Sequence, residues 1–197
     1  MINEELLVEY GAKLEHLEKG EYLFHENDRA NNYFQLKTGK ILMMNVSSDG
    51  KIVAQGHFNP GQSFGEPPLF DDSTYPACAL AEEDSTLFKL RKTRFFKLLK
   101  KNPDIHFQFT KILAIRLQFK SMLLKEISGF KPEHRILTLL DYTKTTAQIP
   151  LTEKQEVKLT RQQIADLTGL RVETVIRAVK ELEKLGEVAL INHKIFR

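Results

Sequence analysis

The segment from Pro103 to Ser128 restricts the possible folds of this chain more than any other. Its sequence predicts one helix, with Pro103 in the first turn and a length of roughly 39 Å at about 1.5 Å per residue. Apolar residues fall on two faces rather than on a single stripe. They are Ile105, Phe107, Phe109, Ile112, Leu113, Ala114, Ile115, Leu117, Phe119, Met122, Leu123, Leu124 and Ile127. Such a helix must be covered on both faces.

The residues before this helix predict a domain of short strands that begins with one helix. Residues 3–17 are expected to be helical, with Asn3 as the cap and leucines on one side. After Gly20, apolar stretches alternate with turns, and Asp49-Gly50 is typical of a hairpin. Separate strands are expected in PACALA and STLFKL, followed by a short helix capped by Thr93. The pattern predicts an antiparallel, jelly-roll-like β-roll.

Two arrangements can cover the long helix. The β-roll can bury one face, and a second copy of the same helix can bury the other through a twofold contact. Alternatively, the helix lies inside a monomer. We favour the homodimer, because a small roll and a short C-terminal domain leave little chain to enclose the helix. Ile112 and Phe119 are our expected contact residues.

The last third of the chain predicts a winged helix–turn–helix. After a hinge in SGFKPEHR, the segment EHRILTLLDYTKT forms a helix. Thr160 caps a helix over 161–168, Gly169 makes the left-handed turn, and a second helix runs from about Val172 to Leu185. The apolar residues expected to face inward on that second helix are Val175, Val179, Leu182 and Leu185. A two-stranded wing turns near Asn192-His193.

The fold class is therefore α+β: a sensor-like β-roll, a long dimerisation helix and a winged helix–turn–helix. We expect one domain over residues 1–128, with the dimerisation helix at about 103–128. The second domain covers 129–197, with the helix–turn–helix at about 161–180.

The exposed start of the second helix carries polar side chains suited to reading DNA. They are Arg171, Glu173, Thr174, Arg177 and Lys180. Arginine pairs with guanine O6 and N7, and glutamate accepts from cytosine N4. The pair Glu173 and Arg177 could instead be a surface ion pair, worth a few tenths of a kcal/mol, and the two could pair in the free protein. Residues 154–197 carry nine Lys and Arg against six Asp and Glu, so the net charge of +3 sits at this end.

Several classes of protein are not indicated. Cys78 is the only cysteine, which excludes an intrachain disulfide, a cysteine zinc site and a four-cysteine iron–sulfur cluster. The scattered histidines show no spacing typical of a metal site, although they do not exclude a haem bound by one histidine. We find no nucleophile–base pair or phosphate loop, and so expect no enzyme. No apolar run could span a bilayer, and the acidic N-terminus does not resemble a signal peptide, so we expect a cytoplasmic protein without membrane partners.

Residues 15–197 resemble the Crp/Fnr family of bacterial transcription regulators. The resemblance lies in YLFHENDRANNYFQLKTGKI, PGQSFGE and TRQQIADLTGLRVETVIRAVKELEKLG. It implies a dimer that binds an inverted repeat in double-stranded DNA, with RNA polymerase as a partner. It also implies that Glu173 and Arg177 read bases, in a half-site with a G-A core. The residues it places near phosphates and bases are Thr160, Arg161, Gln162, Arg171 and Thr174. Val172 lies where the cyclic-AMP receptor protein has an arginine. In this respect the chain is more similar to the Fnr branch of the family.

The sensor departs from the cyclic-AMP pattern of this family. Gly65 and Glu66 match it, but Pro76 and Ala77 replace the arginine and the Ser or Thr that hold the phosphate. In the helix, Lys120 replaces a threonine near the base and Ser121 is retained. We expect no response to cyclic AMP, no cofactor and an effector of unknown identity. The alternative is a module that responds to a cyclic nucleotide or another small molecule and whose C-terminal domain does not read DNA.

Overall fold

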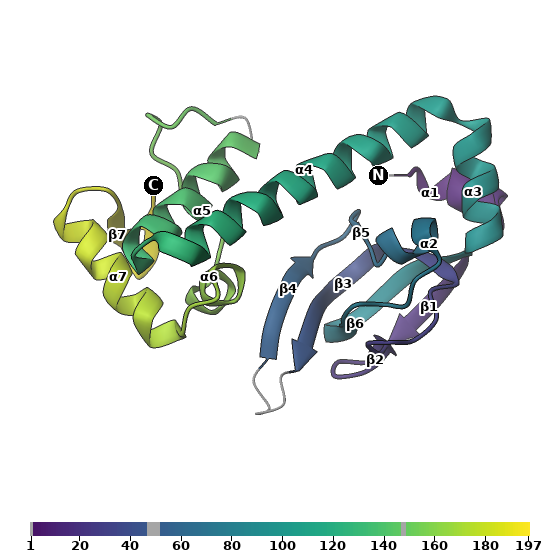
Figure 1. The fold of residues 1–197 in the computed structure, drawn as a ribbon, viewed down its shortest axis with the longest axis horizontal. Coiled ribbons are helices and arrows are strands. Elements are labelled where there is room, and N and C mark those ends of the chain that lie inside the picture. The colour runs from purple at the N-terminus through teal and green to yellow at the C-terminus, as the bar shows by residue number, and fades with distance from the viewer. Residues whose placement is uncertain (1, 47–51, 147–148) are drawn as a thin grey trace. The chain divides into compact units, whose positions relative to one another are not determined.

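The computed structural model describes residues 2–46, 52–146 and 149–197 (Figure 1). The chain forms two compact units, Met1–Ile115 and Arg116–Arg197, and the division falls within the long helix α4 (Pro103–Gly129). That helix matches the predicted segment almost residue for residue. In the part of the chain that is described, no helix has the length and hydrophobicity that crossing a membrane requires.

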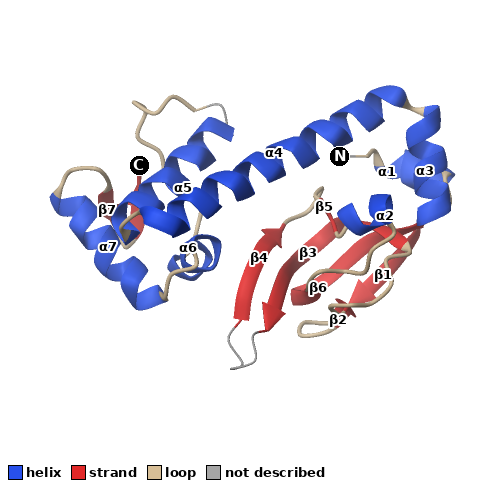
Figure 2. Ribbon diagram, in the orientation of Figure 1, coloured by secondary structure: helices blue, strands red, loops and turns tan. Residues whose placement is uncertain are grey.

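The first unit is built on a six-stranded antiparallel sheet, drawn in red in Figure 2. Its main path is β1-β6-β3-β4, while β2 pairs with β6 and β5 pairs with β3. The register of β3 with β6 shifts between Leu36 and Ile41, which bends the two long strands together. The strands are β1 (Lys13–Leu17), β2 (Tyr22–Phe24), β3 (Asn32–Val46), β4 (Ile52–Phe58), β5 (Ser63–Phe64) and β6 (Cys78–Arg91). The predicted antiparallel β-roll is confirmed.

Aromatic side chains fill the core of the first unit. The rings of Tyr33 and Phe95 stack with centroids 4.5 Å apart, and the Phe109 ring meets the Phe95 ring edge-on at 5.5 Å. All three are buried, and each such side chain contributes about 1.5–3 kcal/mol to folding. Phe109 thereby packs one face of the first part of α4 against the sheet and α3 (Lys92–Lys101).

The predicted helix near the N-terminus was wrong beyond its first residues. Instead of one helix over residues 3–17, the chain forms α1 (Glu4–Glu9), capped by Asn3 as predicted, and then β1. Gly11, with φ +83°, ends the helical course. The following residues pair with β6, from Lys13 opposite Lys89 onward. The sheet therefore overrides the helical spacing of the leucines, because strand pairing satisfies the backbone donors and acceptors of this segment.

Three further predictions concern β6 and its neighbours. PACALA and STLFKL belong to the single strand β6 rather than to two strands. Thr93 does not cap α3: the cap position is Arg91, and the Lys92 N–H donates to the Asn31 carbonyl at 2.9 Å. The expected hairpin turn at Asp49-Gly50 lies outside the described residues. The small helix α2 (Pro67–Asp71) follows β5.

The second unit has its own hydrophobic core, formed mainly by three helices and a wing, with the end of α4 packed against it. Ile136, Ile164, Val175 and Ile195 are buried and come from four different elements. The elements are the end of α4, α5 (Pro132–Thr146), α6 (Arg161–Thr168), α7 (Val172–Lys184), β7 (Ala189–Ile191) and β8 (Lys194–Phe196). They form the predicted winged helix–turn–helix (Figure 1).

Leu185 does not face inward as predicted. It is 72% exposed at the C-terminal cap of α7, whereas Val175, Val179 and Leu182 are buried. Gly186, with φ +76°, turns the chain immediately afterwards. Val188 then occupies the core in place of Leu185, with its N–H bonded to the Leu182 carbonyl at 3.4 Å.

Candidate DNA-binding surface and effector region

The start of α6 is fixed by a reciprocal cap. The Gln163 N–H donates to the Thr160 hydroxyl at 3.1 Å, and the Thr160 N–H donates to the Gln163 side-chain oxygen at 2.9 Å. A cap of this kind stabilises a helix by about 0.5–2 kcal/mol. It holds Arg161 and Gln162 in the first turn of α6, where Gln162 is exposed and donates to Asp166 at 2.7 Å. Thr160 thus has a structural role whether or not it meets DNA.

The turn between α6 and α7 follows the sequence prediction. Gly169 has φ +66°, and the Leu170 N–H donates to the Ala165 carbonyl at 3.1 Å. Arg135 on α5 donates to the Thr168 carbonyl at 3.3 Å, which satisfies an acceptor at the C-terminus of α6. The turn sets the direction in which α7 leaves.

Helix α7 has a buried face and an exposed polar face. Ala178, Val179 and Leu182 pack into the core. The predicted contacts Arg171, Glu173, Arg177 and Lys180 are exposed, and Thr174 is half-buried. Among the described residues, neither Glu173 nor Arg177 has an ion-pair or hydrogen-bonding side-chain partner, so the expected resting pair is not formed. Both side chains are therefore available to a ligand.

A shallow groove brings α6, α7 and the wing together. It encloses about 700 Å³. Its lining residues are Arg161, Ile176, Val179, Lys180, Leu190, Asn192 and His193. The wing turn carries two consecutive left-handed residues, Asn192 at φ +49° and His193 at φ +62°. Sequence reasoning placed the turn there but did not include Asn192 and His193 in the binding surface. Their place at the tip of a two-stranded wing was the available signal.

The predicted effector residues of the first unit have evident structural roles. Gly65 has φ +71°, and a Cβ there would press against the rings of Phe24 and Tyr75. Glu66 is 1% exposed and accepts a short hydrogen bond from the Ser63 hydroxyl. Both residues are therefore explained without a ligand. Gly65 leaves room for two aromatic rings, and Glu66 is a buried carboxylate that is already hydrogen-bonded.

The segment that follows lacks the groups expected to hold a cyclic phosphate. Pro76 is exposed and has no N–H, and its carbonyl accepts from the Asn45 amide at 2.7 Å. Ala77 is 1% exposed. The phenol of the adjacent Tyr75 is neutral at pH 7, and burial raises its pKa further, to about 12. Lys120 and Ser121, the remaining predicted residues, lie on α4 in the second unit at exposed positions.

A charged cluster on the sheet was missed by sequence reasoning. Glu82 of β6 accepts from His57 of β4 at 2.8 Å and from Lys40 of β3 at 3.0 Å. Burial disfavours the Glu82 carboxylate, but the hydrogen bonds and charges of His57 and Lys40 outweigh it and lower its pKa. The three residues are far apart in the sequence and meet only through strand pairing. Across residues 2–46, 52–146 and 149–197, no group of three or more His, Cys, Asp or Glu could hold a metal ion.

The two units together define a class of protein: a ligand-sensor-like β-roll joined by a long helix to a DNA-binding winged helix–turn–helix. Residues 14–102 match the family model of the cyclic nucleotide-binding domain, and residues 134–196 match the Crp-like helix-turn-helix domain. The chain belongs to the Crp/Fnr family of transcription regulators.

A curated relative agrees with this assignment, and solved structures share the fold. The chain is 28% identical over 163 residues to the cAMP-activated global transcriptional regulator CRP of Pasteurella multocida. The aligned region covers 82% of this chain and 78% of the relative. The c-di-GMP responsive global regulator CLP of Xanthomonas campestris has the same fold, with 18% identity, a TM-score of 0.71 and 96% coverage of both chains. A CooA variant from Carboxydothermus hydrogenoformans gives 19% identity and a TM-score of 0.75, covering 100% of this chain and 86% of the other.

Proposed function

We propose that this regulator acts as a homodimer that reads an inverted repeat in double-stranded DNA. The observation that carries the proposal is the exposed, unpaired Glu173 and Arg177 at the start of α7. The first turns of a recognition helix enter the major groove, where these two side chain types distinguish G·C pairs. Arg161, Lys180 and the wing residues His193 and Asn192 border the same helix and suit phosphate contacts.

The exposed apolar side chains of α4 support the dimer. Phe107 is 75% exposed, Leu117 69% and Leu124 67%. Several large apolar groups along one helix are costly to leave in water, and a twofold contact with a second α4 would remove them from it. Two recognition helices related by a twofold axis would read half-sites about one helical turn, roughly 34 Å, apart.

We further propose that cyclic AMP does not control this protein. CRP of Pasteurella multocida is described as cAMP-activated. This chain carries Pro76 and Ala77 where the phosphate would need donors, and the retained Glu66 is engaged by Ser63. RNA polymerase is the expected partner, and the protein is expected to act by binding rather than by catalysis.

Selection of bound fragments from a random pool of duplex DNA tests the proposal. The expected product is an inverted repeat whose half-sites share a G-A core. The same selection with the Arg177→Ala variant should lose the guanine, while Lys184→Ala, at the other end of α7, should return the wild-type motif. Recovery of no motif from the wild-type protein would favour the alternative, a small-molecule-responsive module whose C-terminal domain does not read DNA.

A further inference from the structure

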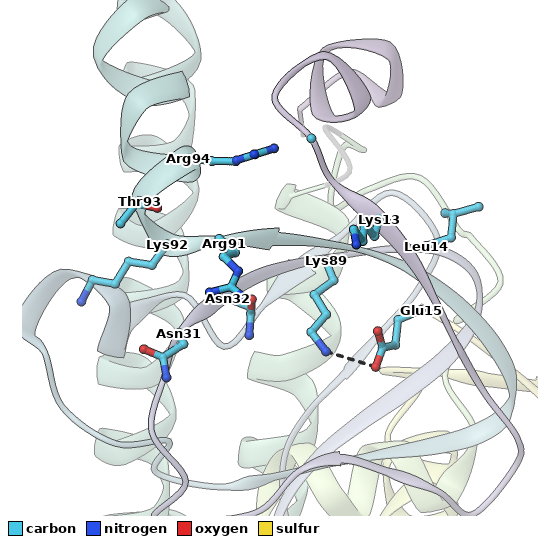
Figure 3. Close-up of a pocket in the computed structure, with 11 residues that line it drawn as sticks. Lys13, Leu14, Glu15, Asn31, Asn32, Lys89, Arg91, Lys92, Thr93 and Arg94 are labelled. Atoms are coloured by element: carbon cyan, nitrogen blue, oxygen red, sulfur yellow. Dashed lines mark hydrogen bonds and ion pairs between the residues drawn. The ribbon is translucent and has the colours of Figure 1, made fainter.

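A basic cleft lies in the first unit, apart from the residues assigned to the effector region. It encloses about 890 Å³ between β1, the end of β6 and the start of α3 (Figure 3). Five cationic residues and one carboxylate line it: Lys13, Lys89, Arg91, Lys92, Arg94 and Glu15. Small-molecule sites usually enclose about 300–1,000 Å³, so the cleft has the size of a ligand site.

The cleft is a local concentration of positive charge in the first unit, separate from the net +3 of residues 154–197. Five cations less one carboxylate give +4 at its lining, against +3 for all 197 residues. The rest of the chain therefore sums to −1. A concave surface of one sign focuses the electrostatic field and raises the local concentration of oppositely charged ligands.

Part of this charge is not neutralised within the protein. The Lys89 ammonium pairs with Glu15 at 3.1 Å, as the dashed line in Figure 3 shows, and Lys92 pairs with Asp72. In the described part of the chain, Lys13 and Arg91 make no ion pair and no side-chain hydrogen bond. These two cations remain for a ligand.

The position of Arg94 depends on a glycine. Its guanidinium donates only a long bond, 3.4 Å, to the Tyr10 carbonyl. It lies over Gly11, where any Cβ would collide with it. Gly11 therefore lets Arg94 reach across the rim of the cleft from α3 while leaving most of its donors unused.

The first turn of α3 adds donors of another kind. Its cap residue Arg91 makes no side-chain capping bond, and Lys92, Thr93 and Arg94 of the first turn all line the cleft. The first N–H groups of a helix lack intrahelical acceptors and carry partial positive charge. Because the Lys92 N–H already donates to Asn31, only the later N–H groups of this turn can serve a ligand. The exposed Thr93 hydroxyl is a further donor beside them.

We propose that this cleft binds a small molecule that carries two or more linked phosphate groups. Guanidinium groups bind phosphate oxygens through paired hydrogen bonds, and cations spread over β1, β6 and α3 can engage more than one phosphate. The amides of Asn31 and Asn32 on the same lining can hydrogen-bond the rest of the ligand. The site goes beyond the proposed DNA-reading function and does not depend on it.

Calorimetric titration of the full chain with inorganic pyrophosphate tests the site, with inorganic phosphate as the comparison. We expect one pyrophosphate per chain, bound at least about tenfold more tightly than phosphate. Arg91→Gln and Lys13→Gln should each weaken pyrophosphate binding about tenfold, the equivalent of one charge-assisted hydrogen bond. Lys100→Gln, which removes an exposed cation at the far end of α3, should change it less than about twofold. Unchanged thermal unfolding midpoints would show that the variants are folded.

A second set of measurements separates this cleft from the DNA-binding surface. Arg177→Ala should leave pyrophosphate binding unchanged, even if it abolishes recognition of DNA. The proposal is overturned if the wild-type chain does not bind pyrophosphate, or if Arg177→Ala loses the binding that Arg91→Gln keeps. It is also overturned if a hexaglutamate peptide binds as tightly as pyrophosphate, because the cleft would then be a general anionic docking surface.

Discussion

The ring of Phe119 on α4 stacks on the ring of Tyr142 on α5, with the centroids 4.6 Å apart. Phe119 is half-buried and packs against the core of the second unit, and burial raises the pKa of Tyr142. Phe119 therefore has a packing role within its own unit, and its expected contact with a second copy of α4 stays a prediction. The most exposed large apolar side chains on this stretch of α4 are Leu117 and Leu124.

The first prediction is that Leu117→Glu combined with Leu124→Glu converts the dimer into monomers. The two residues are seven apart, so they share a helix face. Losing two buried leucines, at about 1.5–3 kcal/mol each, should weaken the dimer by at least about a hundredfold. Light scattering at micromolar concentration would measure the mass, and circular dichroism the helix content.

Two controls accompany this experiment. Gln118→Glu adds a carboxylate at an exposed neighbouring position and should leave the dimer intact. Phe119→Glu should instead lower the free energy of unfolding, because it breaks the stack with Tyr142. A wild-type protein that is already monomeric would contradict the dimer.

The second prediction is that cyclic AMP binds more weakly than about 1 mM, or roughly −4 kcal/mol, in a calorimetric titration. Pro76 offers no N–H and Ala77 no hydroxyl to a phosphate. Replacing both, Pro76→Arg with Ala77→Ser, should raise the affinity, because it adds a guanidinium and a hydroxyl donor. Micromolar affinity of the wild-type chain would show that another cation holds the phosphate.

Local signals were enough to predict the helices of the second unit. Thr160 and Gln163 are three residues apart and cap α6, and Gly169 lies where the chain needs a left-handed residue. Helix α4 could be predicted from its own apolar segment, because the backbone hydrogen bonds of a helix join residues that are close in the sequence. The polar face of α7 could be predicted from the helical periodicity of its apolar residues.

Features that depend on pairing between distant strands could not be predicted in this way. Residues 13–17 have a helical spacing of leucines, yet they form β1 because β6 offers a partner strand. Two sites join segments that are separate in the sequence: the cluster of Lys40, His57 and Glu82, and the basic cleft. The spacing of residues along the chain does not reveal such a contact, because the contact depends on which strands pair and in which register.

The third prediction concerns the pH dependence of stability. Because the pKa of Glu82 lies below its ordinary value of 4.5, the folded state favours the carboxylate. Its contribution is therefore fully present above pH 4.5 and is lost as the pH falls through the lowered pKa. Glu82→Gln should be less stable than the wild type at pH 7, and the difference should be smaller at about pH 3. Urea unfolding at both pH values would measure it.

Glu83→Gln is the matched control for this measurement. Glu83 is the exposed neighbour of Glu82 on β6, and its replacement removes the same charge from the strand. It should change the free energy of unfolding little at either pH. Equal effects of the two replacements would mean that His57 and Lys40 do not stabilise the Glu82 carboxylate.

The last prediction separates base reading from phosphate contact. Arg177→Ala should cost about 1–3 kcal/mol of operator binding and relax the preference for guanine in each half-site. Arg161→Ala, in the first turn of α6 beside Lys180, should weaken all sequences alike and lower the slope of affinity against salt by about one. Both variants, with Lys184→Ala as the control, would be titrated against single-base operator variants at two salt concentrations. If Arg177→Ala kept the wild-type base preference, the start of α7 would not be the reading element, and Arg177 would be only a surface cation.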